Sequence, residues 1–133
     1  MIQCKRAYEA AQPGDGYRVL VDRLWPRNRR KELLPLHAWL AEVAPSTALR
    51  QAFKSKEMDF AAFRQAYRNE LAAHPEYWWP LLEKAERGVL TLIYAARDEQ
   101  RNNAKVLAEW LEEALERRGD QSSPTCYAGE RLG

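Results

Sequence analysis

Two short apolar runs constrain the fold of this chain more than any other feature, because each of them ends in charged residues. Tyr17–Val21 and Val89–Tyr94 are rich in residues that favour β-strands, and they lead into Asp22–Arg23 and Arg97–Asp98. In an α/β protein the carboxyl ends of the strands open into the crevice where ligands bind. The two runs therefore predict an α/β domain with one convergent polar site at the strand ends.

A weaker alternating pattern over residues 2–8 predicts a further strand near a sheet edge. The connector from this strand to Tyr17 is shorter than an ordinary parallel crossover, so the two strands are either antiparallel neighbours or separated by a third. We expect a small parallel or mixed sheet flanked by helices, in a three-layer Rossmann-like or flavodoxin-like architecture.

Apolar residues at helical spacing predict five helices. These are a helix from Pro35 through Val43, a short one capped by Ser46, one capped by Asp59 and stopped by Pro75, one from Pro80 to Gly88, and a long one beginning near Asp98. With 133 residues, the chain has the length of one domain. We place that domain at residues 1–118 and expect residues 119–133 to form a mobile tail.

Composition narrows the function classes. The 21 basic and 19 acidic residues give a net charge of +2, too small for the whole surface to attract a polyanion. No apolar run approaches the roughly 20 residues that span a bilayer, and no signal peptide is present, so we expect a cytoplasmic protein with no membrane partner. Cys4 and Cys126 lack the spacing and histidine neighbours of a zinc site, so no metal centre is predicted.

The first strand end carries a cationic segment with an indole inside it. Arg23 and Arg27 lie nearest the strand, Trp25 lies between them, and Arg29, Arg30 and Lys31 follow. Guanidinium groups donate paired hydrogen bonds to phosphate or carboxylate, and an indole offers a face to a base. The alternative is a solvated loop in which the last three cations serve solubility and Trp25 packs on the sheet.

Other polar residues near the strand ends have both a functional and a structural interpretation. Asp22 and Asp98 are weak candidates for a general base, with an ion-pair role as the alternative for both and helix capping as a further one for Asp98. Ser46, at a helix start, either completes an anion site or simply caps the helix. Arg97 and Asn102 complete the set of expected ligand contacts.

The strand-end segments resemble the domain of unknown function 488 family, in its short bacterial branch. The resemblance covers roughly residues 2–116, and Asp-Arg-Leu-Trp-Pro-Arg at 22–27 is its most specific string. It rests also on Lys5–Arg6, Asp15–Val21, Ala44–Arg50, Thr91–Glu99 and Asn102–Ala104. It implies a compact α/β fold and a bacterial cytoplasmic origin, and it implies no established activity, substrate or cofactor.

Three positions depart from the pattern of that family. Asn28 stands where the family usually has Gly, and Asn tolerates the left-handed conformation that Gly supplies. Lys54–Lys56 replaces a turn that usually contains His, and Arg101 replaces a His before the Asn pair. If the family performs acid–base or metal chemistry through those imidazoles, this chain has lost them.

Three functions follow as hypotheses. The first is a crevice that binds a small phosphorylated or nucleotide-like anion, with hydrolase or transferase activity left open. The second is a nucleic-acid-binding or regulatory module that uses the Arg-rich loop 23–31, whose affinity would fall steeply with salt. The third is an interaction protein that presents Tyr77–Trp79 to a partner, since three adjacent aromatic residues cannot all face inward on one helix. Nothing in the sequence points to a particular cofactor or oligomeric state.

Overall fold

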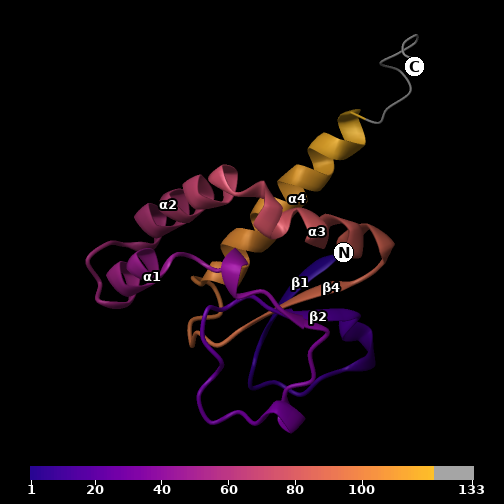
Figure 1. Cartoon of the computed structure of the whole chain (residues 1–133), viewed down its shortest axis with the longest axis horizontal. Coiled ribbons are helices and arrows are strands. Elements are labelled where there is room, and N and C mark those ends of the chain that lie inside the picture. Colours follow the sequence, from indigo (N-terminus) through magenta and orange to yellow (C-terminus); the bar gives the residue numbers. More distant parts are fainter. Residues whose placement is uncertain (122–133) are drawn as a thin grey trace.

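All four strands of the sheet run parallel. The computed structural model describes residues 1–121, and its strands follow the order β1-β4-β2-β3 across the sheet (Figure 1). They are β1 (Ile2–Arg6), β4 (Leu90–Tyr94), β2 (Tyr17–Leu20) and β3 (Ala38–Trp39). The expected α/β class with a parallel sheet is confirmed. The first two strands in the chain are separated by a third, and β1 lies at an edge.

Strand β4 is the centre of the sheet. Leu92 pairs with Cys4 of β1 on one side and with Val19 of β2 on the other, and all five residues of β4 are buried. A strand covered on both faces reads as a continuous apolar run, which explains why Val89–Tyr94 stands out in the sequence.

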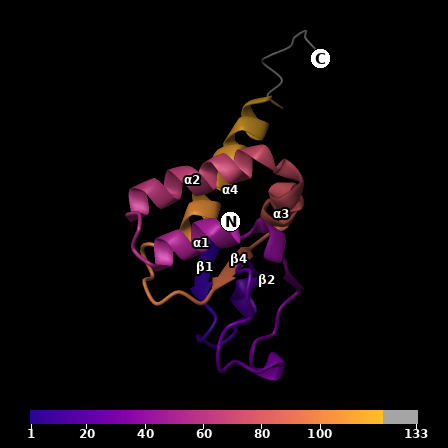
Figure 2. The same ribbon diagram turned by 60° about the vertical axis from the view of Figure 1, so that its left-hand side comes forward.

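The α-helices gather on one face of the sheet (Figures 1 and 2). Strand residues such as Val19 and Leu92 join one core with Phe63, Leu81 and Leu107, which come from three different helices. The helices are α1 (Thr47–Lys54), α2 (Phe60–Ala73), α3 (Pro75–Arg87) and α4 (Asn103–Gln121).

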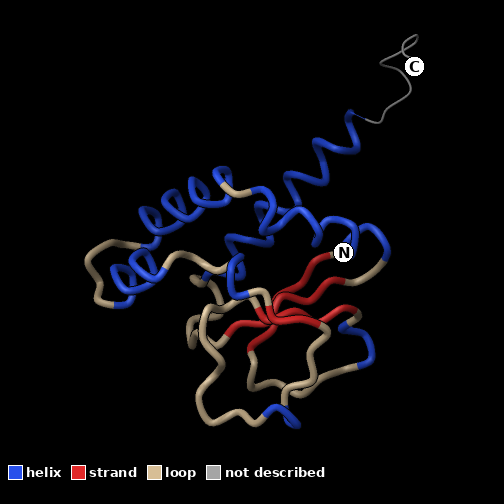
Figure 3. Tube along the Cα trace, in the orientation of Figure 1, coloured by secondary structure: helices blue, strands red, loops and turns tan. Residues whose placement is uncertain are grey.

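Loops, rather than helices, cover the opposite face (Figure 3). Leu20 and Ile93 point to this side because side chains alternate along a strand, and they pack with Ala7 and Leu34 from the connecting segments. Short 3-10 helices at Pro13–Asp15 and Lys31–Leu33 are the only helical turns in the segments 7–16 and 22–37. The third layer of this three-layer fold therefore consists of loops and short 3-10 helices.

A buried polar network fastens this loop layer to the sheet. The Asp15 carboxylate accepts hydrogen bonds from the Lys5 Nζ and Arg18 guanidinium, and its backbone oxygen accepts one from Thr91 Oγ1 at 2.6 Å. Burial opposes ionisation of Asp15, but hydrogen bonds from the Gln12 N–H, Lys5 and Arg18 outweigh it, and its pKa is lowered. Arg18 also donates to the Pro35 oxygen, so one guanidinium ties both loops together.

The helix predicted over Pro35–Val43 is wrong. The segment contains β3 and a 3-10 helix at Ala41–Val43, and β3 pairs with β2 through hydrogen bonds from the His37 and Leu40 N–H groups. Leu36, Ala38 and Leu40 also alternate with the period of a strand. Because the segment pairs with the edge of the sheet, the strand forms in place of the helix.

Two helix starts were also placed wrongly. Helix α3 begins at Pro75 and contains Pro80, and α4 begins at Asn103 instead of near Asp98. The helices capped by Ser46 and Asp59 are confirmed. Helix α4 continues to Gln121, so residues 119–121 are helical, and the remaining part of the expected tail, residues 122–133, lies outside the described residues.

We expect Gly16→Ala to destabilise the fold by about 2 kcal/mol or more. Gly16 has φ 61°, and a Cβ there would lie 2.3 Å from the Val89 backbone oxygen. Gly14→Ala is the matched control, because a Cβ at Gly14 meets nothing within 4 Å. Urea denaturation of the two variants measures the difference, and equal losses would contradict this account of the turn.

We expect Asp15→Asn to lower the free energy of unfolding by about 3 kcal/mol at pH 7, because it leaves the buried Arg18 guanidinium and the half-buried Lys5 ammonium without their carboxylate. The lowered pKa means that the stabilisation is complete above the ordinary carboxyl pKa and is lost as pH falls through the folded-state value. The gap in the free energy of unfolding between wild type and variant should therefore narrow as pH falls below about 4. A gap that stays constant over that range in chemical denaturation would contradict the assignment.

Candidate functional site

The carboxyl ends of β1, β2 and β4 lie together at one end of the parallel sheet, as the sequence predicts. The residues that follow these strands separate into two groups there. One group surrounds Asp22 and Arg23 and contacts the start of α1. The other surrounds Tyr8 beyond the end of β1.

Asp22 holds the strand ends together. Its Oδ2 accepts a hydrogen bond from the Ala95 N–H at 2.9 Å, and its Oδ1 accepts one from the Asn103 side-chain amide at 3.0 Å. Burial raises the pKa of this carboxyl, and the bonds from Asn103 and Ala95 and the charge of Arg50 oppose that rise. Both oxygens are therefore engaged in joining β2 to β4 and α4.

Arg23 turns toward α1. Its Nε donates to the Pro45 oxygen at 3.1 Å and its Nη2 donates to the Ala44 oxygen at 3.2 Å. The side chain lines a cavity of about 270 Å³ together with Ser46, with Glu70 of α2 and with Tyr77 of α3. Arg23 thus supports the segment before α1 and contributes one wall of a small hollow.

Ser46 is fully engaged by its neighbours. Its Oγ accepts a hydrogen bond from the Leu49 N–H, which confirms the capping role, and donates to Glu70 at 2.6 Å. Its own N–H donates to the other Glu70 oxygen at 2.8 Å. Glu70 was not predicted as part of this site, because it lies on α2 and nothing in the local sequence marks it as a partner of Ser46.

The cationic segment after β2 is partly committed to the fold. The Trp25 indole N–H donates to the Arg29 oxygen at 2.6 Å, and the indole packs edge-on against Trp39 with ring centroids 5.6 Å apart. Asn28 has φ 58°, the left-handed conformation that its type tolerates. The Trp25 side chain therefore has a packing role within the fold, which is the structural alternative stated for it above.

Two anchored guanidinium groups flank the Tyr8 ring. The Arg6 Cζ lies 5.1 Å from the ring centroid and the Arg29 Cζ lies 5.9 Å from it. Arg6 donates to the Ala96 oxygen at 2.9 Å and to the Ala95 oxygen at 3.3 Å. Arg29 donates to the Ala7 oxygen at 3.2 Å and to the Tyr8 oxygen at 3.5 Å. In neither side chain does Nη1 have a hydrogen-bond acceptor within residues 1–121.

Arg27 and Arg97 belong to the two segments whose backbones contact Tyr8 and Arg6. Both side chains are exposed, the Arg27 oxygen accepts a hydrogen bond from the Tyr8 hydroxyl at 2.8 Å, and Arg97 follows the residue whose oxygen holds Arg6. We call Arg6, Tyr8, Arg27, Arg29 and Arg97 the Tyr8 patch. Arg6 and Tyr8 were not predicted as site residues, although Arg6 ends the first strand and so has the same positional signal as Arg23.

Asn102, and not Asp98, caps α4. The Asn102 Oδ1 accepts a hydrogen bond from the Lys105 N–H at 2.9 Å, and its side chain is 2% exposed and donates to the Asp98 backbone oxygen. The Asp98 Oδ1 instead accepts from the Gln100 and Arg101 N–H groups, which lower its pKa. The capping role expected for Asp98 is therefore wrong, because the chain makes one more turn before α4 begins.

Three further features bear on function: metal-ligand clusters, membrane-spanning helices and the aromatic segment Tyr77–Trp79. Among residues 1–121, no three His, Cys, Asp or Glu side chains lie close enough to hold a metal ion. Of the helices in this part of the chain, none combines the length and the apolarity needed to cross a bilayer. In the aromatic segment Trp78 is 7% exposed, whereas Tyr77 and Trp79 are 37% and 58% exposed, so the three rings do not all face inward.

We expect Asn102→Ala to lower the free energy of unfolding by about 1–2 kcal/mol, because it removes the α4 cap and the hydrogen bond to the Asp98 backbone oxygen. Asp98→Ala should cost clearly less, since that side chain is exposed and bonds only within its own turn. Thermal or urea denaturation of both variants ranks the two losses. If Asp98→Ala lowered the free energy of unfolding as much as Asn102→Ala, the result would identify Asp98 as the cap.

Comparison with known proteins places these residues in a family. A family model described as the inactive DUF488-N3 subclade matches residues 1–128. The uncharacterized protein YeaO of Escherichia coli K12 is 49% identical over 110 residues, which cover 83% of this chain and 96% of YeaO. The uncharacterized protein Rv3073c of Mycobacterium tuberculosis H37Rv is 38% identical over 113 residues, covering 83% and 92% of the two chains. No solved structure gives a significant match. The chain belongs to the DUF488 family, within the subclade described as inactive.

Proposed function

We propose that this protein binds a small phosphorylated or nucleotide-like anion at the Tyr8 patch and does not convert it chemically. One observation carries the proposal: two guanidinium groups, each anchored on two backbone oxygens, flank one partly exposed tyrosine ring at the carboxyl ends of β1 and β4. In open parallel sheets this end is where ligands bind.

The anchoring prepares the two guanidinium groups for an anion. A long side chain that is already held by the backbone loses little rotational freedom on binding, so more of the contact energy appears as affinity. The Nη1 groups of Arg6 and Arg29 remain available as donors, and a phosphate is suited to planar donors of this kind. The Tyr8 ring is 37% exposed, so part of it remains accessible to a base.

Charge in the neighbourhood favours an anion. Arg27 and Arg97 are exposed beside the anchored pair, and Arg30 and Lys31 are exposed further along the same loop. The Glu9 carboxylate accepts a hydrogen bond from the Arg6 backbone N–H at 3.0 Å and is the acidic group bonded directly to the patch. Cations therefore outnumber this carboxylate around Tyr8.

Several observations favour binding over catalysis. The two carboxylates considered as a general base accept hydrogen bonds from backbone and amide groups of the fold, Asp22 through both oxygens and Asp98 through Oδ1. Burial raises the pKa of the Cys4 thiol to about 11, which keeps it protonated and poorly nucleophilic. The matching family model carries the description inactive, and Arg101 and Lys54–Lys56 occupy the positions at which the resemblance led us to expect histidines.

The nucleic-acid hypothesis draws on the same face of the molecule. Among the residues of that hypothesis, Arg27, Arg30 and Lys31 are exposed and Arg29 has an available Nη1, whereas Arg23 and Trp25 are bonded within the fold. These four cations neutralise few phosphates, so we favour the small anion. The two functions differ in how affinity responds to salt.

We expect isothermal titration with inorganic phosphate, AMP and a short single-stranded oligonucleotide to show saturable binding of phosphate and tighter binding of AMP. Arg27→Ala and Arg97→Ala should each weaken AMP binding about tenfold, the effect of losing one charge-assisted hydrogen bond. Arg87→Ala is the matched control, because Arg87 is an exposed arginine on α3, outside the patch.

The remaining outcomes decide between the hypotheses. Binding of the oligonucleotide alone, erased by added salt, would favour the nucleic-acid module. Unchanged AMP affinity in both variants, or no binding of any of the three probes, would overturn the proposed site. Catalysis is tested in the same samples, since hydrolysis of AMP would appear as released phosphate.

A further inference from the structure

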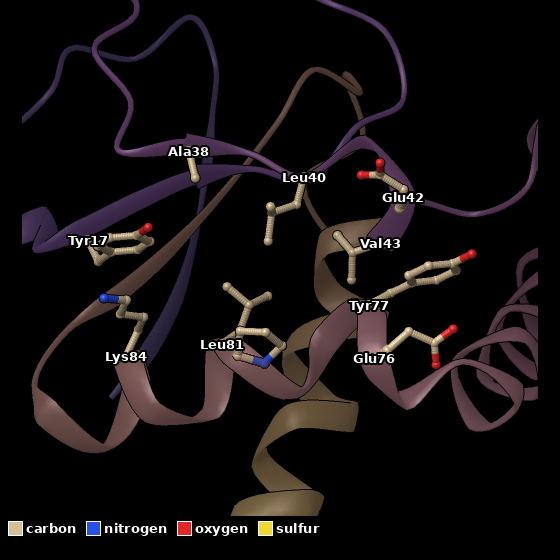
Figure 4. Close-up of a pocket in the computed structure, with 10 residues that line it drawn as sticks. Tyr17, Ala38, Leu40, Glu42, Val43, Glu76, Tyr77, Leu81 and Lys84 are labelled. Carbon is tan, nitrogen blue, oxygen red and sulfur yellow. The ribbon is translucent and has the colours of Figure 1, made fainter.

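A second concave surface lies away from the Tyr8 patch, between the sheet edge and α3. It has a volume of about 350 Å³, and Figure 4 shows the side chains of Ala38 and Leu40 reaching from the β3 segment toward Leu81 on α3. Seven of its ten lining residues are apolar or aromatic: Tyr17, Ala38, Leu40, Val43, Tyr77, Pro80 and Leu81. Strand β3 is an edge strand, so this hollow opens beside the unpaired side of the sheet.

The acidic and basic side chains of this hollow lie at opposite ends. Glu42 and Glu76 stand at one end with the Tyr77 ring between them, and Lys84 stands with Tyr17 at the other end (Figure 4). The Lys84 ammonium lies 4.7 Å from the centroid of the Tyr17 ring. The hollow therefore has an acidic end and a basic end joined by an apolar floor.

The Glu76 carboxylate at the acidic end stays ionised near neutral pH. The Glu76 backbone N–H and His74 lower the pKa of Glu76, and the His74 Nδ1 lies 3.2 Å from its Oε2. The His74 ring also stacks on Tyr77, with centroids 4.8 Å apart. The Glu42 carboxylate is exposed and has no hydrogen bond to a side chain or backbone group within residues 1–121.

We propose that this hollow binds a small organic cation, an ammonium group on an aliphatic or aromatic body. The ammonium lies against the Tyr77 ring between Glu42 and Glu76, and the apolar body covers Leu40, Pro80 and Leu81. Cations bind favourably over aromatic faces, and two carboxylates beside such a face strengthen the attraction. Lys84 repels a second positive charge, so the ligand carries its cation at one end only.

The size of the hollow favours a small molecule over a peptide. Its volume lies at the lower limit of the roughly 300–1,000 Å³ that small-molecule sites occupy. A short amine body fills such a space, whereas an extended peptide has most of its length outside it. This site is independent of the anion site proposed at the Tyr8 patch, and the two share no lining residue.

We expect n-hexylamine to bind with saturable shifts of the amide resonances of Leu40, Tyr77 and Leu81 in a ¹H–¹⁵N correlation spectrum at pH 7. Affinity should increase from butylamine to hexylamine by about three- to fourfold for each methylene buried. Hexanoate, with the same body and the opposite charge, should bind at least tenfold more weakly.

Two variants test the acidic end. Glu42→Gln should weaken hexylamine at least threefold, and this exposed side chain has no bond whose loss would unfold the protein. Glu116→Gln, an exposed glutamate on α4 outside the hollow, is the matched control and should leave the affinity unchanged. Phosphate binding at the Tyr8 patch should be the same in both variants.

The opposite results overturn the proposal. Equal affinity for hexylamine and hexanoate would show that charge plays no part. An unchanged affinity in Glu42→Gln, or the absence of any saturable shift with hexylamine, would show that the hollow is not a cation site. None of these results bears on the anion site, which is tested with different ligands.

Discussion

The unequal covering of the two faces of the sheet governs the rest of this structure. On one face α1 to α4 satisfy their own backbone groups and need only apolar contacts to dock. On the other face the loops must find partners for N–H and C=O groups that no ladder satisfies. The buried Asp15 carboxylate and the Arg18 guanidinium supply part of this, and they stabilise the loop layer where a large apolar core is lacking.

The same requirement explains how the arginines are used. Arg6, Arg18, Arg23 and Arg29 each donate to backbone oxygens of irregular segments, through hydrogen bonds that a helix or strand would have made internally. A guanidinium has five N–H donors, so two bonds to the backbone leave others available. A ligand site of this kind arises where such an anchored group also faces solvent, as Arg6 and Arg29 do beside Tyr8.

Sequence patterns were sufficient where one local rule acted alone. The buried run of β4, the caps Ser46 and Asp59, and the left-handed conformation tolerated at Asn28 follow from side-chain type and immediate neighbours. Sequence patterns gave the wrong element where two local rules competed. Residues 35–43 fit both a helical and a strand period, and pairing with β2, which is remote in sequence, selected the strand.

The sequence by itself determined that this chain forms an α/β domain with cations at the ends of its strands, because hydrophobic period and strand-end position are local properties. Only the tertiary structure decided which cations share a site. Arg23 and Arg27 are four residues apart, yet Arg23 bonds toward α1 whereas Arg27 lies beside Tyr8. That division depends on which backbone oxygens the folded loops bring within reach of each guanidinium, and loops without a regular period carry no signal of that arrangement in their sequence.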